Sequence, residues 1–307
     1  MLQSKSLLFG VVFLFTQQLL AQYPDDLRGD GLKAWIKMYW YDEQFSDLGY
    51  DAAREAMYSD VDEVEGMIHC IYTDFEQAAS VTTYPNPISA EHIIPQSFFG
   101  GESPMRSDLH NLRPAHGSVN SARSNHPYAE VDDAAASWYG IDAGGSYVST
   151  GTQPSSDENY SERVGSLWEP QEDRKGDLAR SVFYFFTVYH HQAGDISVLG
   201  DLNMLRDWHL TDPTDAPEIE RNNRVEAAQG NRNPYVDYPD LVDHVWFWTD
   251  ADGCTYPSAM NYDSTANRDD LSCLFEAPCP ADFNGDGLVQ IADLLTLLAF
   301  FGLSCED

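Results

Sequence analysis

The chain has 307 residues, of which 43% are hydrophobic and 13% are aromatic. This is enough apolar material for a sizeable core, so we do not expect a globally disordered protein. Acidic residues number 50 against 17 basic ones, which gives a formal net charge of −33 at pH 7. Such a charge argues against a protein that holds nucleic acid on a broad basic surface.

The N-terminus has the pattern of an export signal. Lys5 is followed by an apolar run from Leu7 to Phe15 and then by a small residue, Ala21. The run is short for a bilayer span, and we find no other segment that is long and apolar enough. We therefore expect a signal peptide over residues 1–21, a secreted (extracellular or periplasmic) protein and no transmembrane segment. A signal anchor or a buried first helix is the alternative.

The cysteines are distributed unevenly. Cys254, Cys273, Cys279 and Cys305 lie in the last fifth of the chain, whereas Cys70 stands in an apolar stretch. Four clustered cysteines in an exported chain predict two disulfides in a small module. Three pairings are open, and we favour Cys254–Cys273 with Cys279–Cys305. Cys70 is interpreted as a buried thiol.

The sequence of residues 22–248 predicts one mainly helical body with long loops. Its strand signals are weak and short, so we expect few strands. Asp177 to His191 carries apolar residues on one helical face, and Asp215 to Gln229 is a charged helix that Gly230 ends. The expected elements are, in chain order, strand signals at Ile93-Ile94 and Asn111-Leu112-Arg113, a loop or hairpin over 139–159, and helices over 177–191 and 215–229.

The densest cluster of chemically active residues is Glu91-His92-Ile-Ile-Pro95, followed by 108–114 and 117–125. A short strand carries an acid beside an imidazole, and after a turn a helix presents Asn120. A carboxylate and an amide oxygen are hard ligands that suit Mg²⁺ or Ca²⁺. A neutral imidazole beside them can take a proton from water. Adjacent residues of a regular strand point to opposite faces, so the strand has to end or bulge here.

The whole pattern resembles the endonuclease I family, periplasmic and secreted nucleases with a ββα-metal (His-Me finger) active site. Glu-His-Ile-Ile-Pro, Asp-Leu-His-Asn-Leu-x-Pro and Gly-x-x-Asn-x-x-Arg-Ser-Asn carry the resemblance. It continues in Trp168-Glu-Pro, in Lys175-Gly-Asp-Leu-Ala-Arg180, and in the stretches 205–209, 220–224 and 229–234. It covers roughly residues 25–248.

The resemblance implies roles for individual residues. His92 would be the general base, and Glu91 and Asn120 would hold one catalytic Mg²⁺. Arg106 and Arg123 would assist the reaction, Arg106 by holding the product phosphate, and Arg113 and Asn125 would contact the substrate phosphate. The alternatives stay open: a surface salt bridge for Arg106, and internal pairs with Asp108 or Glu130 for Arg113 and Arg123. We interpret His110 as a brace of the strand–helix turn and 231–233 as a loop tether or a second contact to the site.

The last segment contains a calcium-loop pattern. Oxygen-bearing positions 1, 3, 5, 9 and 12, with glycine at position 6, match an EF-hand loop. It resembles one half of a dockerin module, so we expect Ca²⁺ held by Asp282, Asn284, Asp286, the Leu288 carbonyl, Gln290 and Asp293. A helix with Leu294, Leu295, Leu298 and Phe301 follows. We divide the tail into a cysteine-bracketed spacer, 249–277, and this calcium segment, 278–307.

Together these features predict an α+β protein with a mainly helical body around a ββα-metal core and a disulfide-clasped calcium tail. The resemblance implies a secreted, monomeric endonuclease without sequence specificity that cleaves DNA and also RNA and leaves 5′-phosphate ends. Its tail would either dock to a cell surface or a protein, or only stabilise the chain. The alternatives are an RNA-preferring ribonuclease on the same site and an inactive calcium-dependent binding protein.

Overall fold

The computed structural model describes residues 23–301 apart from 191, 193, 275–282 and 284–288. The chain divides into two compact units, one ending at Trp248 and one starting at Thr249. The predicted signal peptide lies outside the described residues. Within the described part, every helix is too short or too polar to span a bilayer.

The first unit combines helices with small antiparallel sheets, which confirms the expected α+β class. Its helices are α1 (Gly29–Ile36), α2 (Tyr50–Ala56), α3 (Gly117–Arg123), α4 (Lys175–Val188), α5 (Leu202–Thr211), α6 (Ala216–Gln229), α7 (Pro234–Asp237) and α8 (Leu241–Trp246). Its strands are β1 (Glu63–Val64), β2 (Met67–His69), β3 (Glu76–Ala78), β4 (Ile88–His92), β5 (Leu112–His116), β6 (Ser137–Ile141), β7 (Tyr147–Thr150), β8 (Ser161–Val164) and β9 (Leu167–Glu169). They form sheets in the orders β1-β2-β3, β4-β5 and β7-β6-β8-β9.

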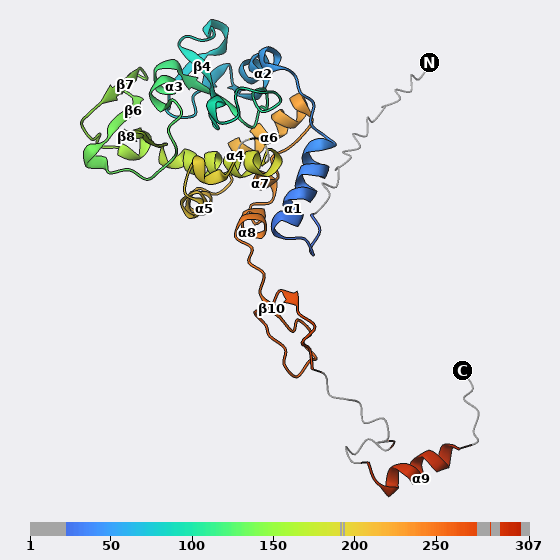
Figure 1. Ribbon diagram of the computed structural model, residues 1–307. Coiled ribbons are helices and arrows are strands. Elements are labelled where there is room, and N and C mark those ends of the chain that lie inside the picture. The colour runs from blue at the N-terminus through green and yellow to red at the C-terminus, as the bar shows by residue number, and fades with distance from the viewer. Residues whose placement is uncertain (1–22, 191, 193, 275–282, 284–288, 302–307) are drawn as a thin grey trace, which may run out of the picture. The chain divides into compact units, whose positions relative to one another are not determined.

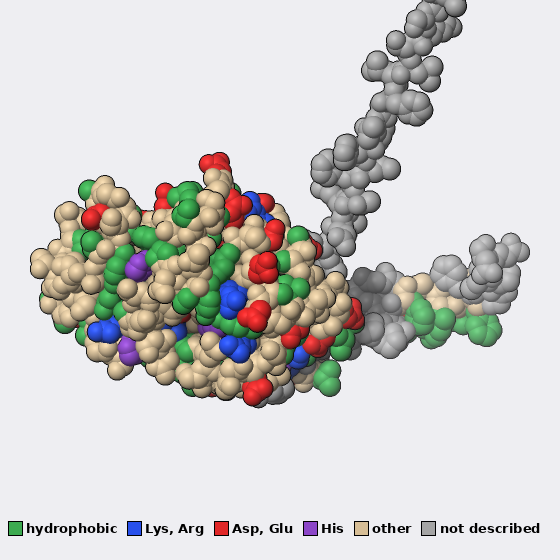
Figure 2. All heavy atoms as spheres, turned by 90° about the horizontal axis from the view of Figure 1, so that it is seen from above, with side chains coloured by type: hydrophobic (Ala, Val, Ile, Leu, Met, Phe, Trp, Pro, Cys, Tyr) green, Lys and Arg blue, Asp and Glu red, His purple; other side chains and the backbone are tan. Residues whose placement is uncertain are grey.

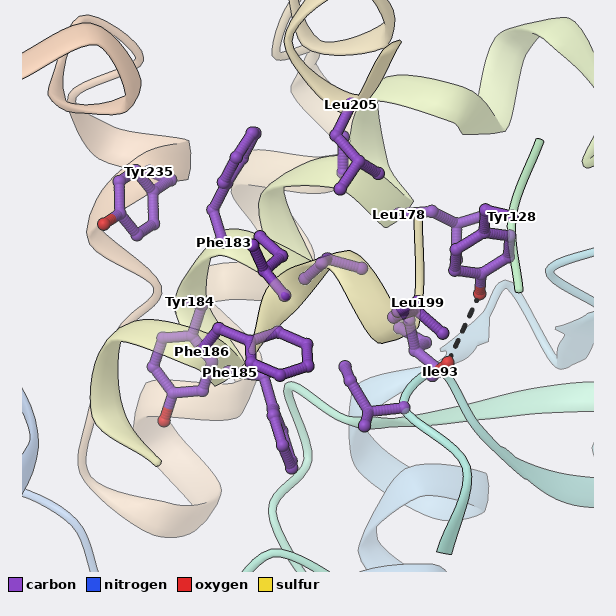
Figure 3. Close-up of a cluster of buried hydrophobic side chains, with 14 of the residues drawn as sticks. Ile93, Tyr128, Leu178, Phe183, Tyr184, Phe185, Phe186, Leu199, Leu205 and Tyr235 are labelled. Atoms are coloured by element: carbon purple, nitrogen blue, oxygen red, sulfur yellow. Dashed lines mark hydrogen bonds between the residues drawn. The ribbon is translucent and has the colours of Figure 1, made fainter. Parts of the chain in front are cut away.

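Helix α4 is the centre of the hydrophobic core. Figure 1 shows it between α1 at one end of this unit and the β6–β8 sheet at the other. Its apolar spacing predicted one buried face, but every residue of α4 except Asp177 is buried. The helix is therefore packed on all sides, as expected for a helix in the middle of a core. Phe183, Phe185 and Phe186 fill the space around it (Figure 3).

The predicted strand at Ile93-Ile94 is wrong, because β4 ends at His92. Both isoleucines are completely buried and anchor the end of the strand in the core. The hydroxyl of Tyr128 donates to the Ile93 carbonyl at 3.4 Å (Figure 3), and the Ile94 N–H donates to Asn111 Oδ1 at 2.8 Å. The apolar pair fixes the position of β4 without belonging to it.

Helix α6 begins and ends as its sequence predicts. Asp215 Oδ1 caps its first turn by accepting from the Glu218 N–H, and Gly230 ends it in the left-handed region at φ 94°. The last helical side chain, Gln229, donates to Asp108 Oδ1 at 2.9 Å and accepts from the Leu109 N–H at 2.8 Å. The end of α6 thus holds the loop that leads into β5.

The residues interpreted as braces are placed accordingly. His110 is buried, lies 3.3 Å from the Asn231 carbonyl through Nε2 and packs against the ring of Tyr184. Asn231 donates to the Tyr184 hydroxyl at 2.7 Å, and Asn233 caps α7. These contacts make 231–233 a loop tether. The stretch 139–159 contains the antiparallel hairpin β6–β7.

The second unit is small and lightly packed. It contains the parallel pair β10 (Asp252–Gly253) and β11 (Arg268–Asp269), and helix α9 (Ile291–Phe300). The Cys254–Cys273 disulfide is present, as predicted, and Cys70 of the first unit is a buried free thiol. Cys279 and Cys305 and the calcium-loop residues Asp282, Asn284, Asp286 and Leu288 lie outside the described residues. Gln290 and Asp293 stand at the start of α9.

We predict that Gly230→Ala destabilises the first unit by roughly 3 kcal/mol, because a side chain there meets two penalties. The left-handed backbone disfavours any Cβ, and the new atom would collide with the Gln44 carbonyl oxygen. Gly145→Ala is the matched control, since Gly145 has a similar φ of 78° but open space around it. Urea unfolding of both variants measures the difference. Equal destabilisation of the two would contradict the predicted collision.

Candidate functional site

The candidate residues meet along one edge of the hairpin formed by β4 and β5. The sheet has only these two strands, and Glu91 pairs with Arg113 and His92 with Leu112 in regular antiparallel register. A cavity of about 480 Å³ is lined by the consecutive residues 89–92 together with Asn120. Because consecutive side chains alternate between faces, a cavity lined by all of them lies along the free edge of β4. The strand ends at His92, which is one of the two arrangements expected, and both Glu91 and His92 reach the same space.

Glu91 is a buried carboxylate held from behind. Tyr72 donates its hydroxyl to Oε1 at 3.0 Å, and Arg123 Nε lies 3.3 Å from the same oxygen. Burial raises the pKa of Glu91 to about 7, although the Arg123 charge and the Tyr72 hydrogen bond oppose the rise. Both contacts are made through Oε1, and the His92 backbone N–H is a further partner of the carboxylate. Glu91 also lines the cavity, where its carboxylate can meet a ligand.

His92 is fixed by its surroundings in one orientation. Its Nε2 lies 2.9 Å from the Arg106 carbonyl oxygen, and its Nδ1 lies 3.3 Å from Gln96 Nε2. A carbonyl only accepts, so Nε2 carries the proton and Nδ1 carries the lone pair. Burial, aided by the charges of Arg106 and Arg123, lowers the pKa of His92 to about 4. The ring is therefore neutral at physiological pH, with Nδ1 as its basic atom.

Asn120 supplies the third member of the constellation. Its Nδ2 donates to Ser89 Oγ at 2.8 Å and to the Ala90 carbonyl at 3.3 Å, which ties α3 to β4. Since the NH₂ group makes these bonds, the amide oxygen Oδ1 is the atom left for a ligand. The Glu91 carboxylate and the Asn120 amide supply hard oxygens to one cavity, which suits a Mg²⁺ ion that keeps most of its waters. Among the described residues, no cluster of three or more acidic, histidine or cysteine side chains offers a denser metal site.

The four remaining predicted residues separate into two groups. Asn125 lines the cavity, and Arg106 lies over the ring of Tyr50, another lining residue, at 4.1 Å from its centroid. Arg123 is completely buried and donates to the Ile93 carbonyl at 2.6 Å, so it lies behind Glu91 and outside the cavity. Arg113 is buried in a different cavity of about 410 Å³, with Arg174 and Arg221 among its neighbours. Neither predicted internal partner, Asp108 or Glu130, pairs with Arg113 or Arg123 within the described contacts.

Residues that sequence reasoning missed complete the site. Tyr72 orients Glu91, Gln96 faces the basic nitrogen of His92, and Tyr50 stacks on the imidazole with ring centroids 5.8 Å apart. Gln96 follows His92 by only four residues, so its position next to His92 could have been predicted from the local sequence. Tyr50 and Tyr72 come from α2 and from the loop after β2, and only the tertiary fold brings them here.

The chain is similar in sequence to known nucleases. The sequence model of the endonuclease I family matches residues 31–240. An extracellular ribonuclease of Bacillus amyloliquefaciens is 34% identical over 172 residues, which cover 51% of this chain and 53% of that protein. An extracellular ribonuclease of Bacillus subtilis (strain 168) is 33% identical with the same coverage. An extracellular deoxyribonuclease of Aeromonas hydrophila is 26% identical over 170 residues, 50% of this chain and 66% of that protein. The chain thus matches about half the length of the ribonucleases.

We predict that His92 makes the protein sensitive to acid. The pKa of His92 is about 4 in the folded protein against 6.5 for an ordinary histidine. As the pH falls from 6.5 towards 4, the unfolded chain takes up a proton that the folded state refuses, and stability is lost in that window. Between pH 7 and pH 4.5 this costs about 2.5 kcal/mol. Chemical unfolding at both pH values should show that His92→Gln loses less stability than the wild type by about this amount. An equal acid loss in both proteins would refute the buried, neutral imidazole.

Proposed function

The chain belongs to the endonuclease I family, and from this membership we propose that it is an exported, divalent-metal-dependent endonuclease that hydrolyses phosphodiester bonds in nucleic acids. The observation that carries the proposal is the single cavity shared by Glu91, His92 and Asn120. Export is supported by the N-terminal pattern, by the Cys254–Cys273 disulfide and by the extracellular relatives.

The chemistry follows from the protonation state of His92. Its Nδ1 takes a proton from a water as the oxygen of that water attacks phosphorus, and the P–O3′ bond breaks to leave a 5′-phosphate. The Glu91 carboxylate and Asn120 Oδ1 would hold one Mg²⁺, which when bound offsets negative charge on the phosphate and on the departing 3′ oxygen. Because water is the nucleophile, a 2′-hydroxyl is not needed. The site is therefore suited to both DNA and RNA.

The roles of the arginines are revised by their positions. Arg106 keeps the proposed role of a substrate-phosphate contact, because its Nε has no described hydrogen-bond partner and its side chain reaches Tyr50 at the cavity. Asn125 keeps the same role. Arg123 becomes a positioning residue for Glu91, since a fully buried guanidinium cannot touch a nucleic acid. Arg113, in the other cavity, is no longer proposed as a phosphate contact.

RNA preference is the second candidate. It is favoured by the higher identity to the two extracellular ribonucleases, 34% and 33%, than to the deoxyribonuclease, 26%. Parallel digestion of plasmid DNA and ribosomal RNA separates the two cases. The described residues offer no helix poised to read base edges in a major groove, so we propose cleavage without base specificity.

We predict that the protein nicks plasmid DNA or degrades RNA with Mg²⁺, and that excess EDTA abolishes this. His92→Ala should lower the rate about 10²- to 10⁴-fold, the usual contribution of a general base. His69→Ala is the matched control, because His69 is half-exposed and lies outside the cavity. Gel assays of cleavage measure all four conditions.

Three outcomes would overturn parts of this proposal. Cleavage that survives both EDTA and His92→Ala would remove the mechanism. No cleavage of either nucleic acid under any condition would favour the alternative of an inactive calcium-dependent binding protein. A product ladder confined to one sequence would contradict the absence of base specificity.

For the tail we propose a calcium site built on the loop pattern from Asp282 to Asp293. We predict that the full chain binds one Ca²⁺ there by calorimetric titration, and that Asp286→Ala removes this binding. Glu91→Gln is the control, because it alters the oxygen ligands of the first unit and leaves the loop intact. Retention of the Ca²⁺ signal in Asp286→Ala would rule out the loop as its origin.

A further inference from the structure

The cavity at Glu91 continues into a second one. A cavity of about 670 Å³ is lined by Pro85, Asn86, Gly117, Ser118 and Ser121, and it shares Ser89 and Asn120 with the first. Because the two spaces have Ser89 and Asn120 in common, they adjoin at these residues, and we call them together the groove. The groove thus extends from the candidate reaction centre past Asn120.

The groove is nearly free of carboxylates, although the protein as a whole is strongly acidic. Among the described residues that line its two halves, Glu91 is the one carboxylate, in a chain with 50 acidic residues. Figure 2 looks onto the side where α2, α3 and β4 lie, and uncharged side chains occupy broad areas of it between the acidic ones. Exposed charges beyond about 8 Å are screened at physiological salt. A polyanion can therefore enter here although the whole protein repels it.

One end of the groove carries two tyrosines flanked by arginines. Tyr50 and Tyr84 line the cavity of about 480 Å³. The Arg54 guanidinium lies over both rings, 4.1 Å from the centroid of Tyr84 and 5.5 Å from that of Tyr50. Arg54 also pairs with Asp51 at 3.3 Å, but that carboxylate is 90% exposed, so the pair is weak. Tyr84 keeps 45% of its surface exposed.

We propose that Tyr84 and Arg54 form a subsite for one unpaired nucleotide, in DNA or RNA, next to the phosphodiester that is cleaved. Arg54 covers one face of the Tyr84 ring, so in this proposal the π face of a nucleobase stacks on the opposite face, and the guanidinium contacts the neighbouring phosphate. A base inside a duplex is stacked on its neighbours and cannot use such a ring, so the subsite selects single strands. The other end of the groove, with the Asn86 amide and the Ser118 hydroxyl, offers neutral donors to the backbone. This inference rests on the proposed function.

The test is direct binding of a fluorescein-labelled single-stranded decanucleotide to the full chain in EDTA, followed by anisotropy. We expect Tyr84→Leu to weaken binding about tenfold or more, the usual effect of losing one stacked base, and Tyr84→Phe to restore it. Arg54→Gln should weaken binding and reduce the salt dependence by about one phosphate contact. Tyr39→Leu is the matched control, because Tyr39 is 43% exposed and lies outside both halves of the groove. A blunt duplex of the same sequence should bind more weakly than the single strand.

The outcomes separate this subsite from the proposed function. If the wild type cleaves nucleic acid but Tyr84→Leu and Arg54→Gln bind the oligonucleotide as tightly as the wild type, the subsite is refuted and the nuclease stands. If the wild type cleaves nothing but binding depends on Tyr84, the nuclease fails and the subsite stands. Binding that is absent up to millimolar protein, or equal for duplex and single strand, overturns the subsite as well. Circular dichroism of each variant excludes misfolding as the cause.

Discussion

The buried guanidinium of Arg123 is the contact on which the geometry of the site depends. It joins the last residue of α3 to the end of β4 by donating to the Ile93 carbonyl, and it places its charge beside Glu91. A buried carboxylate without such a partner would be strongly destabilising. With the guanidinium in place, the buried Glu91 carboxylate is stabilised while it still lines the cavity. The same guanidinium fixes the helix that carries Asn120 against the strand. Strand, helix and acid therefore act as one rigid piece.

This rigid piece is held in the core by apolar side chains that take no part in the chemistry of the site. Ile93 and Ile94 anchor the end of β4 in the aromatic cluster around α4. Gln229, at the end of α6, fixes the loop before β5 through its hydrogen bonds. The reactive side chains thus stand on a short, two-stranded edge that would be marginal alone. Packing elsewhere in the unit supplies the rigidity that a site of this kind needs.

The sequence predicted what is local. Glu91, His92 and Asn120 fall within 30 residues in a spaced motif, and the structure brings them to one cavity. Helix α6 was predicted from its cap residues, because Asp215 and Gly230 act through their own backbone neighbours. The predicted strand at Ile93-Ile94 was wrong because an apolar pair has the same sequence pattern whether it lies within a strand or anchors the end of a strand in the core.

What the sequence could not predict depends on long-range packing. Tyr72 and Tyr50 reach the site from elsewhere in the chain, and nothing in their local sequence marks them. Arg113 and Arg123 had the right spacing for a substrate contact, yet tertiary packing buries both. The net charge is limited in the same way, because a sum over the chain says nothing of where carboxylates are missing.

The hydrogen bond between His92 Nε2 and the Arg106 carbonyl has an evolutionary consequence. The partner of the imidazole is main chain, which every amino acid provides. The side chain at position 106 can therefore be exchanged through mutation without turning the ring or changing which nitrogen is basic. The orientation and the tautomer of His92 are therefore independent of the residue type at position 106, and only the pKa of the ring responds to the charge there.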